Sequence, residues 1–288
     1  MARFLFWSDL HLEFNGAGPV PQPEDMPGEL PDAILIAGDL ATAGRHVDAL
    51  LVAWDAWRVP ILMVPGNHEY YGKHRVQKTV RMEAERLSEI RAAGADIDVL
   101  RCRSRVIGDT RVLGATLWTG FDLAGGDRRQ LAMNLASDKM NDYRRIQWHD
   151  ARRGIFRKMI PADTLEMHRH EKSWLLETLA QPFDGRTVVM THHIPVAQQL
   201  KDNRNQMESC AYASDLWPLI GYHAVDAWIS GHSHDNVECV LEGAEGPVAF
   251  LSNARGYPGE DTGFQPFRIL DSNEVTLAAT PETDGPTP

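Results

Sequence analysis

The stretch Phe4-Leu5-Phe6-Trp7-Ser8-Asp9-Leu10-His11 joins a short apolar run to two side chains that can bind a metal ion. Its apolar part is rich in aromatic and branched residues and is too short for a helix, which predicts a buried β-strand. Asp9 and His11 are two residues apart, so at the end of an extended strand they point to the same side. This strand is therefore expected to deliver a carboxylate and an imidazole to one ion.

Four more apolar runs end in a polar cluster in the same way. The runs cover residues 33–37, 61–64, 188–190 and 227–229, and the clusters after them are Gly38-Asp39, Gly66-Asn67-His68-Glu69, His192-His193 and Gly231-His232-Ser233-His234. Helical patterns at about His46–Trp57 and Lys73–Ala93 separate several runs, which favours largely parallel pairing of the strands. Because ligands collect beyond the carboxyl ends of such strands, we expect all five clusters to meet at one site.

The clusters combine carboxylate, amide and imidazole donors and contain no thiolate. This mixture suits Mn, Fe, Zn or Co better than the oxygen-only cages that bind Ca or Mg. The carboxylate of Asp39 can bridge two cations and offset their repulsion. A pair of divalent first-row ions is a known solution to phosphate-ester hydrolysis, so the clusters predict that reaction. Each cluster alone is weak evidence, and it is their number and order that indicate the site.

The composition limits the fold class, the compartment and the partners. The chain has 288 residues, 43% of them hydrophobic, which suits one large domain with a substantial core. No apolar stretch approaches the roughly 18 to 20 residues of a membrane span, and Phe4–Trp7 is expected to be a strand rather than a signal sequence. The three widely spaced cysteines favour a reducing, cytoplasmic location. The net charge of −11 opposes tight binding to duplex nucleic acid.

We expect a single domain over residues 1–279, followed by a flexible tail at 280–288. The Pro- and Gly-rich segment 15–31 is predicted to be a loop that borders the site. Residues from about 120 to 178 contain no metal motif and are predicted to form an insertion that caps the site. Strand-like runs near the C-terminus predict a second, antiparallel sheet packed on the first: 237–241, 248–251, 267–270 and 275–278.

A basic cluster lies within this insertion, and it includes Arg144, Arg145, Arg152, Arg153, Arg157 and Lys158. Two interpretations of it remain open. It can be the solvated face of a helix. It can also hold the phosphate of a small substrate, with Trp148 available to stack on a ring.

In order, the five clusters read D-x-H, G-D, G-N-H-[DE], H and G-H-x-H, and the chain resembles a bacterial-type calcineurin-like metallophosphoesterase from Asp9 to His234. The resemblance implies an α/β fold in which two mixed β-sheets pack as a sandwich flanked by helices. Its sheets are mixed, which corrects the emphasis on parallel pairing given above. It implies hydrolysis of a phosphomonoester or small phosphodiester by a hydroxide that bridges two metal ions.

The resemblance also implies roles for single residues. One metal is matched by Asp9, His11, Asp39 and His234. The other is matched by Asp39, Asn67, His192 and His232. Asp39 is then the bridge and, with His68, a catalytic residue, while His68 itself faces the substrate phosphate without binding metal. The two ions are expected to be Mn, Fe or Zn, with Co and Ni as further candidates.

Two more residues are candidates for substrate binding. His193 follows the expected ligand His192, and Arg255 lies in a Gly- and Pro-rich segment that resembles one in bacterial relatives. A guanidinium there can hold a phosphate oxygen, although a surface arginine in a loop is the alternative.

The chain departs from the protein Ser/Thr phosphatases of the superfamily, which extend G-D to G-D-x-x-D-R-G. Residues 38–44 lack the second Asp, which orients the catalytic histidine in those enzymes. This weakens a protein-phosphatase assignment and leaves the partner of His68 unidentified, since Glu69 is expected to point away from it.

Two other functions remain open at this point. A nuclease or a cyclic-nucleotide phosphodiesterase can use the same ligands, because loops rather than ligands set specificity. A non-catalytic metal-binding scaffold is the alternative from another class. A small phosphorylated substrate is the expected partner, no membrane is expected, and the sequence does not indicate an oligomeric state.

Overall fold

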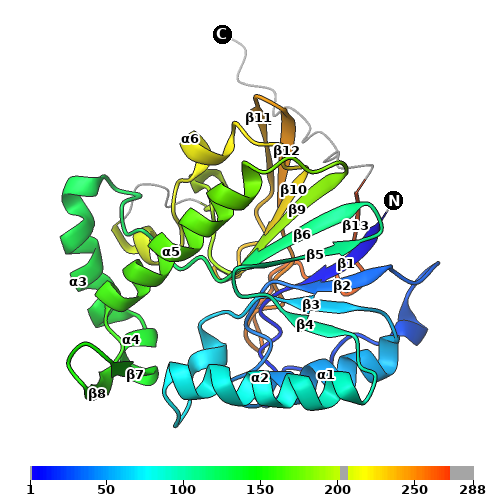
Figure 1. Ribbon diagram of the computed structural model, residues 1–288, viewed down its shortest axis with the longest axis horizontal. Helices are drawn as coiled ribbons and strands as arrows, with labels where there is room; N and C mark the ends of the chain where they lie inside the picture. Colours follow the sequence, from blue (N-terminus) through cyan, green and yellow to red (C-terminus); the bar gives the residue numbers. More distant parts are fainter. Residues whose placement is uncertain (1, 202–206, 273–288) are drawn as a thin grey trace.

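The computed structural model describes residues 2–201 and 207–272. Two mixed β-sheets pack face to face at its centre (Figure 1). The first has the order β13-β1-β2-β3-β4, in which the last four pair in parallel and β13 runs antiparallel to β1. Its strands are β1 Arg3–Trp7, β2 Ala33–Ile36, β3 Ile61–Met63, β4 Ile97–Val99 and β13 Ile269–Asp271.

The second sheet has the order β11-β12-β10-β9-β6-β5. Its four central strands pair in parallel, and each edge strand runs antiparallel to its neighbour. The strands are β5 Arg103–Ile107, β6 Thr110–Ala115, β9 Arg186–Thr191, β10 Ala227–Ser230, β11 Cys239–Gly243 and β12 Gly246–Ser252. The predicted sandwich of two mixed sheets is confirmed.

Strand β1 shows why the apolar runs are continuous. Phe4 and Phe6 face the second sheet and belong to the core between the two layers. Leu5 and Trp7 point the opposite way and pack under the helices α1 His46–Trp57 and α2 Val76–Ala92. A strand covered on both faces is apolar at every position, which is the pattern that parallel sheets produce.

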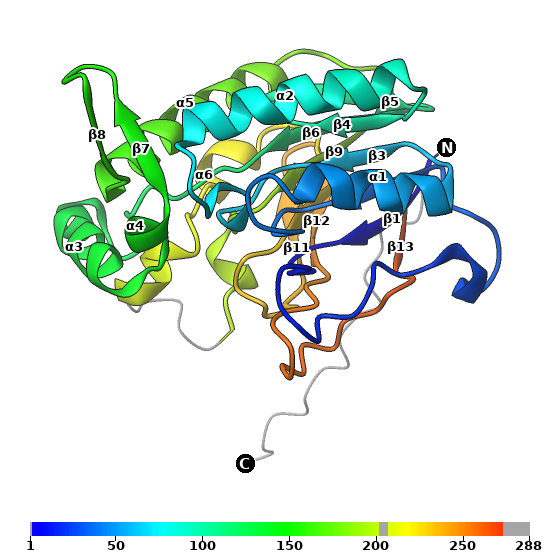
Figure 2. The same ribbon diagram turned by 90° about the horizontal axis from the view of Figure 1, so that it is seen from below.

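Helices cover both outer faces of the sandwich. Figure 2 shows α1 and α2 side by side over the first sheet. The second sheet is covered by α5 Pro161–Leu179 and the short α6 Trp217–Ile220, whose apolar residues join its outer core. Within the described residues no helix combines the length and the apolar composition needed to cross a bilayer.

The predicted insertion lies at one end of the sandwich in both views (Figures 1 and 2). Its elements are the 3-10 helix η3 Gly126–Arg128, α3 Arg129–Lys139, α4 Asp142–Arg145, β7 Gln147–Asp150 and β8 Ile155–Lys158. These pack around a separate apolar cluster that contains Tyr70 and Trp118. Helix α5 begins in this cluster and ends on the second sheet, so the last part of the segment 120–178 belongs to the sandwich.

The C-terminal strands do not form a sheet of their own, contrary to expectation. β11 and β12 extend the second sheet beside β10, whereas β13 pairs with β1 in the first. The second sheet also contains β5 and β6, which the sequence analysis did not assign. β6 belongs to its parallel centre, and β5 is an antiparallel edge strand. The run at 275–278 and the tail at 280–288 lie outside the described residues.

Four short 3-10 helices complete the described fold: η1 Pro23–Asp25, η2 His68–Tyr70, η4 Ala197–Gln199 and η5 Met207–Ala211. The first lies in the predicted loop 15–31, and η2 directly follows the metal-ligand candidate Asn67.

Candidate metal centre

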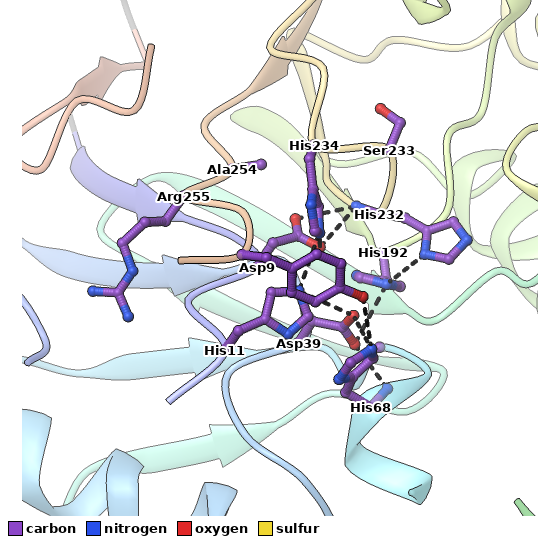
Figure 3. A network of polar contacts seen from close by, with 12 residues as sticks. Asp9, His11, Asp39, His68, His192, His232, Ser233, His234, Ala254 and Arg255 are labelled. Atoms are coloured by element: carbon purple, nitrogen blue, oxygen red, sulfur yellow. Dashed lines mark hydrogen bonds and ion pairs between the residues drawn. The ribbon is translucent and has the colours of Figure 1, made fainter. Parts of the chain in front are cut away.

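The seven predicted ligands meet where five strands end. Asp9 and His11 follow β1, Asp39 follows β2 and Asn67 follows β3 in the first sheet. His192 follows β9, and His232 and His234 follow β10, in the second sheet. Figure 3 shows the labelled side chains of this set turned toward one another. All are buried except His234, which is partly exposed.

The side chains form two groups of donors with Asp39 between them. The ligand atoms of Asp9, His11 and His234 lie within 4.8 Å of one another, and so do those of Asp39, His192 and His232. A third such set, His11, Asp39 and His68, shares one residue with each of these groups. Asp39 Oδ2 is 3.9 Å from His11 Nε2, in the first group. Asp39 Oδ1 is 3.5 Å from His192 Nε2, in the second. The two oxygens of one carboxylate therefore face different groups.

Five of these residues have a left-handed backbone conformation. Their φ angles are positive: Asp9 52°, His11 46°, Asp39 53°, His232 72° and His234 57°. Residues other than glycine seldom occupy this region, which costs of order 1–3 kcal/mol for each residue. The strain turns each side chain toward the centre directly after its strand, and the surrounding contacts must hold it there.

Hydrogen bonds outside the cluster fix the imidazoles. His192 Nδ1 donates to the carbonyl oxygen of Ala37 at 2.9 Å, which leaves Nε2 facing the donors. His234 Nδ1 donates to Glu260 Oε2 at 2.7 Å and presents Nε2 in the same way. Such outer partners set the tautomer and the orientation of metal-binding histidines.

Glu69 fixes the backbone of two ligand turns. Its buried carboxylate accepts four backbone N–H groups at 2.6–3.2 Å, those of Asp39, Leu40, Ala41 and Gly66. The turn after β2 is therefore tied to the turn after β3. Both Glu69 oxygens are engaged by these backbone groups.

The amide of Asn67 is oriented by the insertion. Its Nδ2 donates to Asp142 Oδ1 at 2.8 Å and to Tyr71 Oη at 3.0 Å, while the Tyr71 hydroxyl also donates to Asp142. The amide oxygen is thereby turned inward, where Oδ1 lies 3.0 Å from His192 Nε2. Asp142 belongs to α4 and was missed by the sequence analysis, because no spacing links it to the motifs.

The electrostatics of the cluster favour added positive charge. Burial, with the nearby carboxylates of Glu69 and Asp9, raises the pKa of Asp39 well above its ordinary value. Burial alone would raise the pKa of Asp9 and lower that of His234. The contact between them reverses both shifts, so that the pKa of Asp9 is lowered and that of His234 rises to about 9.

Several nitrogens of the cluster also lack ordinary hydrogen-bond partners. His11 Nε2 lies 3.0 Å from His234 Nε2, and His192 Nε2 lies 3.2 Å from His232 Nδ1. His232 Nε2 is buried without a hydrogen-bond partner among the described residues. Imidazole nitrogens that face one another beside buried carboxylates fit divalent cations, and the donor set suits first-row metals.

His68 lies at the edge of the cluster. Its Nε2 is 3.9 Å from Asp39 Oδ2 and 3.3 Å from the Tyr257 hydroxyl. Its ring stacks on Tyr71, with centroids 4.3 Å apart. Its backbone N–H donates to Asp39 Oδ1 at 2.9 Å, which places His68 beside the carboxylate that separates the donor groups.

The two predicted substrate residues are placed differently. His193 is buried, and its ring packs between Trp118 and His232 with centroid distances of 5.0 Å and 4.2 Å. The Arg255 guanidinium donates to the carbonyl oxygens of Leu10 and Pro19 and points away from the cluster in Figure 3. The structure therefore does not bring Arg255 to the site, and these contacts instead hold the loop after β1.

Gly66 provides a test of the packing at the site. A β-carbon at this position would collide with Asp39 Oδ1 and the His192 ring, so Gly66→Ala is expected to displace both ligands and abolish metal binding. Gly126→Ala is the control, because nothing lies within 4 Å of the added carbon. Metal content measured by plasma mass spectrometry checks this. A Gly66→Ala protein with wild-type metal content would contradict the geometry.

Asp142 provides a second test. Asp142→Ala frees the Asn67 amide and is expected to weaken metal binding about 10- to 100-fold, as loss of an outer partner does. Asp142→Asn keeps an oxygen that accepts from Asn67 and should bind nearly as well as the native protein. Calorimetric titration with Mn²⁺ measures both, with circular dichroism to confirm folding. Equal affinities for Asp142→Ala and the native protein would exclude the orienting role.

The comparisons with known proteins agree with this geometry. The family model described as calcineurin-like phosphoesterase matches residues 2–236. The chain is 22% identical over 293 residues to "Uncharacterized protein L509" of Acanthamoeba polyphaga mimivirus, covering 96% of this chain and 99% of that protein.

A solved structure shares the fold. Phosphopantetheinyl hydrolase (PptH) from Mycobacterium tuberculosis aligns with a TM-score of 0.63 at 15% sequence identity, over 88% of this chain and 89% of that one. The match to the family model covers most of the chain and includes all seven ligand positions. The chain therefore belongs to the calcineurin-like phosphoesterase family and is a metal-dependent phosphoesterase.

Proposed function

We propose that this protein hydrolyses small phosphate esters, monoesters or diesters, with two divalent first-row ions, namely Mn, Fe or Zn. The observation that carries the proposal is the position of Asp39, whose two carboxylate oxygens face separate groups of donors. A single ion would need only one of these groups.

Each ion has its own set of residues in this proposal. One is held by Asp9, His11, His234 and Asp39. The other is held by Asn67, His192, His232 and again Asp39. When bound, two such ions supply an activated water as nucleophile and neutralise charge on the phosphoryl oxygens.

His68 acts as the general acid. Its Nε2 faces the cluster beside Asp39, and so it can give a proton to the oxygen of the leaving group. Tyr257, with 37% of its surface exposed, lies over the rings of His11 and His234 and places its hydroxyl near His68 Nε2. Tyr257 therefore forms the wall of the site on its open side.

Three of the six residues of the basic cluster in the insertion are already engaged. Arg157 forms ion pairs with Asp150 and Asp163, Arg152 pairs with Glu166, and Arg144 donates to the Asp138 carbonyl. These contacts favour the interpretation as a solvated surface for those residues.

Arg145 makes none of these contacts and lies beside Tyr71. It is exposed, and its guanidinium lies 5.6 Å from the centroid of the Tyr71 ring, which stacks in turn on His68. We therefore assign it to the anionic part of a small substrate. The net charge of −11 opposes a long nucleic acid in the same position.

Asp39→Ala tests the shared ligand. One residue serves both ions, so its removal should lower the metal content at both sites and abolish turnover. Asp48→Ala, which removes an exposed carboxylate on α1, is the control and should leave both unchanged. Hydrolysis of 4-nitrophenyl phosphate and metal content measure the outcome. Near-normal turnover by Asp39→Ala would mean that the site does not use a bridging carboxylate.

Arg145→Ala tests the substrate class. KM for small phosphoesters should rise about tenfold with little change in kcat, because one charge-assisted contact is worth about 1.5–3 kcal/mol at most. Arg144→Ala, its exposed neighbour, is the matched control. Unchanged KM in Arg145→Ala would remove this residue from the substrate site.

The native protein loaded with Mn²⁺ should be assayed on 4-nitrophenyl phosphate, bis(4-nitrophenyl) phosphate, cyclic nucleotides and duplex DNA. We expect the small esters to be the better substrates. Duplex DNA as the best substrate would favour a nuclease, and no turnover on any ester would favour a non-catalytic scaffold.

A further inference from the structure

We propose that Glu13 is the positioning residue of His68: its carboxylate accepts a hydrogen bond from His68 Nδ1 and so turns Nε2 toward the substrate. This inference rests on the proposed function, in which His68 is the general acid. It identifies the partner that the sequence analysis left open, since Thr42 stands where the protein phosphatases have their second Asp.

The two nitrogens of the His68 ring have different surroundings. Nδ1 lies 2.6 Å from Glu13 Oε1, which is the length of a strong, charge-assisted hydrogen bond. Nε2 lies on the other side, 3.3 Å from the Tyr257 hydroxyl and 3.9 Å from Asp39 Oδ2. Because Glu13 holds a proton on Nδ1, Nε2 is the ring nitrogen that can exchange a proton with the substrate.

The loop after β1 places Glu13 rigidly. Arg255 donates to the carbonyl oxygens of Leu10 and Pro19, on either side of Glu13 in the sequence. Phe14 packs edge-on against Tyr257, with ring centroids 5.2 Å apart. The Glu13 side chain is only 8% exposed, so its direction is set by packing and not by solvent.

The second carboxylate oxygen of Glu13, Oε2, is buried and accepts no hydrogen bond among the described residues. A carboxylate whose purpose is to hold the chain together normally uses both oxygens, as Glu69 does with its four backbone N–H groups. The side-chain hydrogen bonds of Glu13 to other residues go to His11 and His68, which indicates a role in the site.

A second histidine competes for the same oxygen. His11 Nδ1 lies 3.4 Å from Glu13 Oε1, and His11 is a predicted metal ligand. If this were the main contact, Glu13 would act on metal binding and not on His68. The contact to His68 is shorter by 0.8 Å, the difference between 3.4 Å and 2.6 Å, and it is therefore the stronger bond.

In the proposed step, the oxygen of water bonds to phosphorus while the bond from phosphorus to the leaving oxygen breaks. The leaving oxygen takes the Nε2 proton of the doubly protonated His68 ring, which becomes neutral and retains the proton on Nδ1, and the proton lost by the water passes to solvent. Glu13 keeps the proton on Nδ1 throughout. Its contribution is thus to the orientation and the tautomer of His68, and it touches no reacting atom.

A double-mutant cycle tests this coupling. His68→Ala should lower kcat by roughly 10² to 10⁴, the range for a general acid. Glu13→Ala should lower kcat about 10- to 100-fold while KM and metal content stay native. In the His68→Ala background, Glu13→Ala should cost less than about twofold. An equal loss in both backgrounds would overturn the proposal, as would a fall in metal content that accounts for the loss.

Two further readouts separate positioning from a general structural effect. Glu13→Gln keeps an oxygen that can accept from Nδ1 and should recover part of the kcat that Glu13→Ala loses. The loss in Glu13→Ala should be larger for phenyl phosphate than for 2,4-dinitrophenyl phosphate, whose leaving group needs no acid. The same loss on both esters, with no recovery in Glu13→Gln, would contradict the positioning role.

Nuclear magnetic resonance of ¹⁵N-histidine-labelled, Zn²⁺-loaded protein reports the contact without turnover. In its neutral form the His68 ring should carry its proton on Nδ1 in the native protein and lose this preference in Glu13→Ala. A neutral His68 protonated on Nε2 in the native protein would overturn the inference. Absence of turnover on every phosphoester would instead refute the proposed function, while the spectra would still decide the contact.

Discussion

The candidate metal centre depends on one buried carboxylate that binds no metal itself. Glu69 accepts four backbone N–H groups and so ties the turn that carries Asp39 to the turn that precedes Asn67. Hydrogen bonds to a charged group are worth roughly 1.5–3 kcal/mol each, enough to offset the strain of a left-handed residue in the turn. Asp39 has this strained conformation, and it is the residue whose oxygens face both groups of donors.

The outer contacts of the site come from segments that are remote in the sequence. Asp142 of α4 orients the Asn67 amide, Glu260 holds the outer nitrogen of His234, and Ala37 does the same for His192. The insertion therefore contributes a contact to the candidate metal centre as well as lying beside it. A change in the packing of α4 would alter the orientation of Asn67, a predicted metal ligand.

Much of the site could be predicted from the sequence, because each ligand directly follows an apolar strand. Strand ends converge in a parallel sheet, so local patterns were enough to place Asp9 and Asp39 together. His192 follows a strand of the second sheet and reaches them because the two sheets pack face to face. Contacts such as that between Asp142 and Asn67 could not be found, because they join segments with no shared motif. Glu13 lies two residues after His11 in the sequence, but only the folded loop shows that it contacts His68. Arg255 had two interpretations from the sequence, and only the structure shows that its guanidinium bonds to backbone carbonyls.

The pairing of the C-terminal strands could not be predicted from the sequence, for a different reason. Short apolar runs such as those of β12 and β13 look alike, and nothing local tells which sheet each joins. In the folded chain β12 pairs with β10 in the second sheet, and β13 pairs with β1 at the edge of the first. The flanking helices, in contrast, follow from periodicity, and α1 extends from His46 to Trp57 as predicted.

The central claim is that Asp39 joins two metal sites, and anomalous diffraction from crystals grown with Mn²⁺ tests it most directly. We expect two anomalous peaks, one on each side of the Asp39 carboxylate. The first should lie among Asp9, His11 and His234, and the second among Asn67, His192 and His232. A single peak at full occupancy, or two peaks that do not share Asp39, would contradict it.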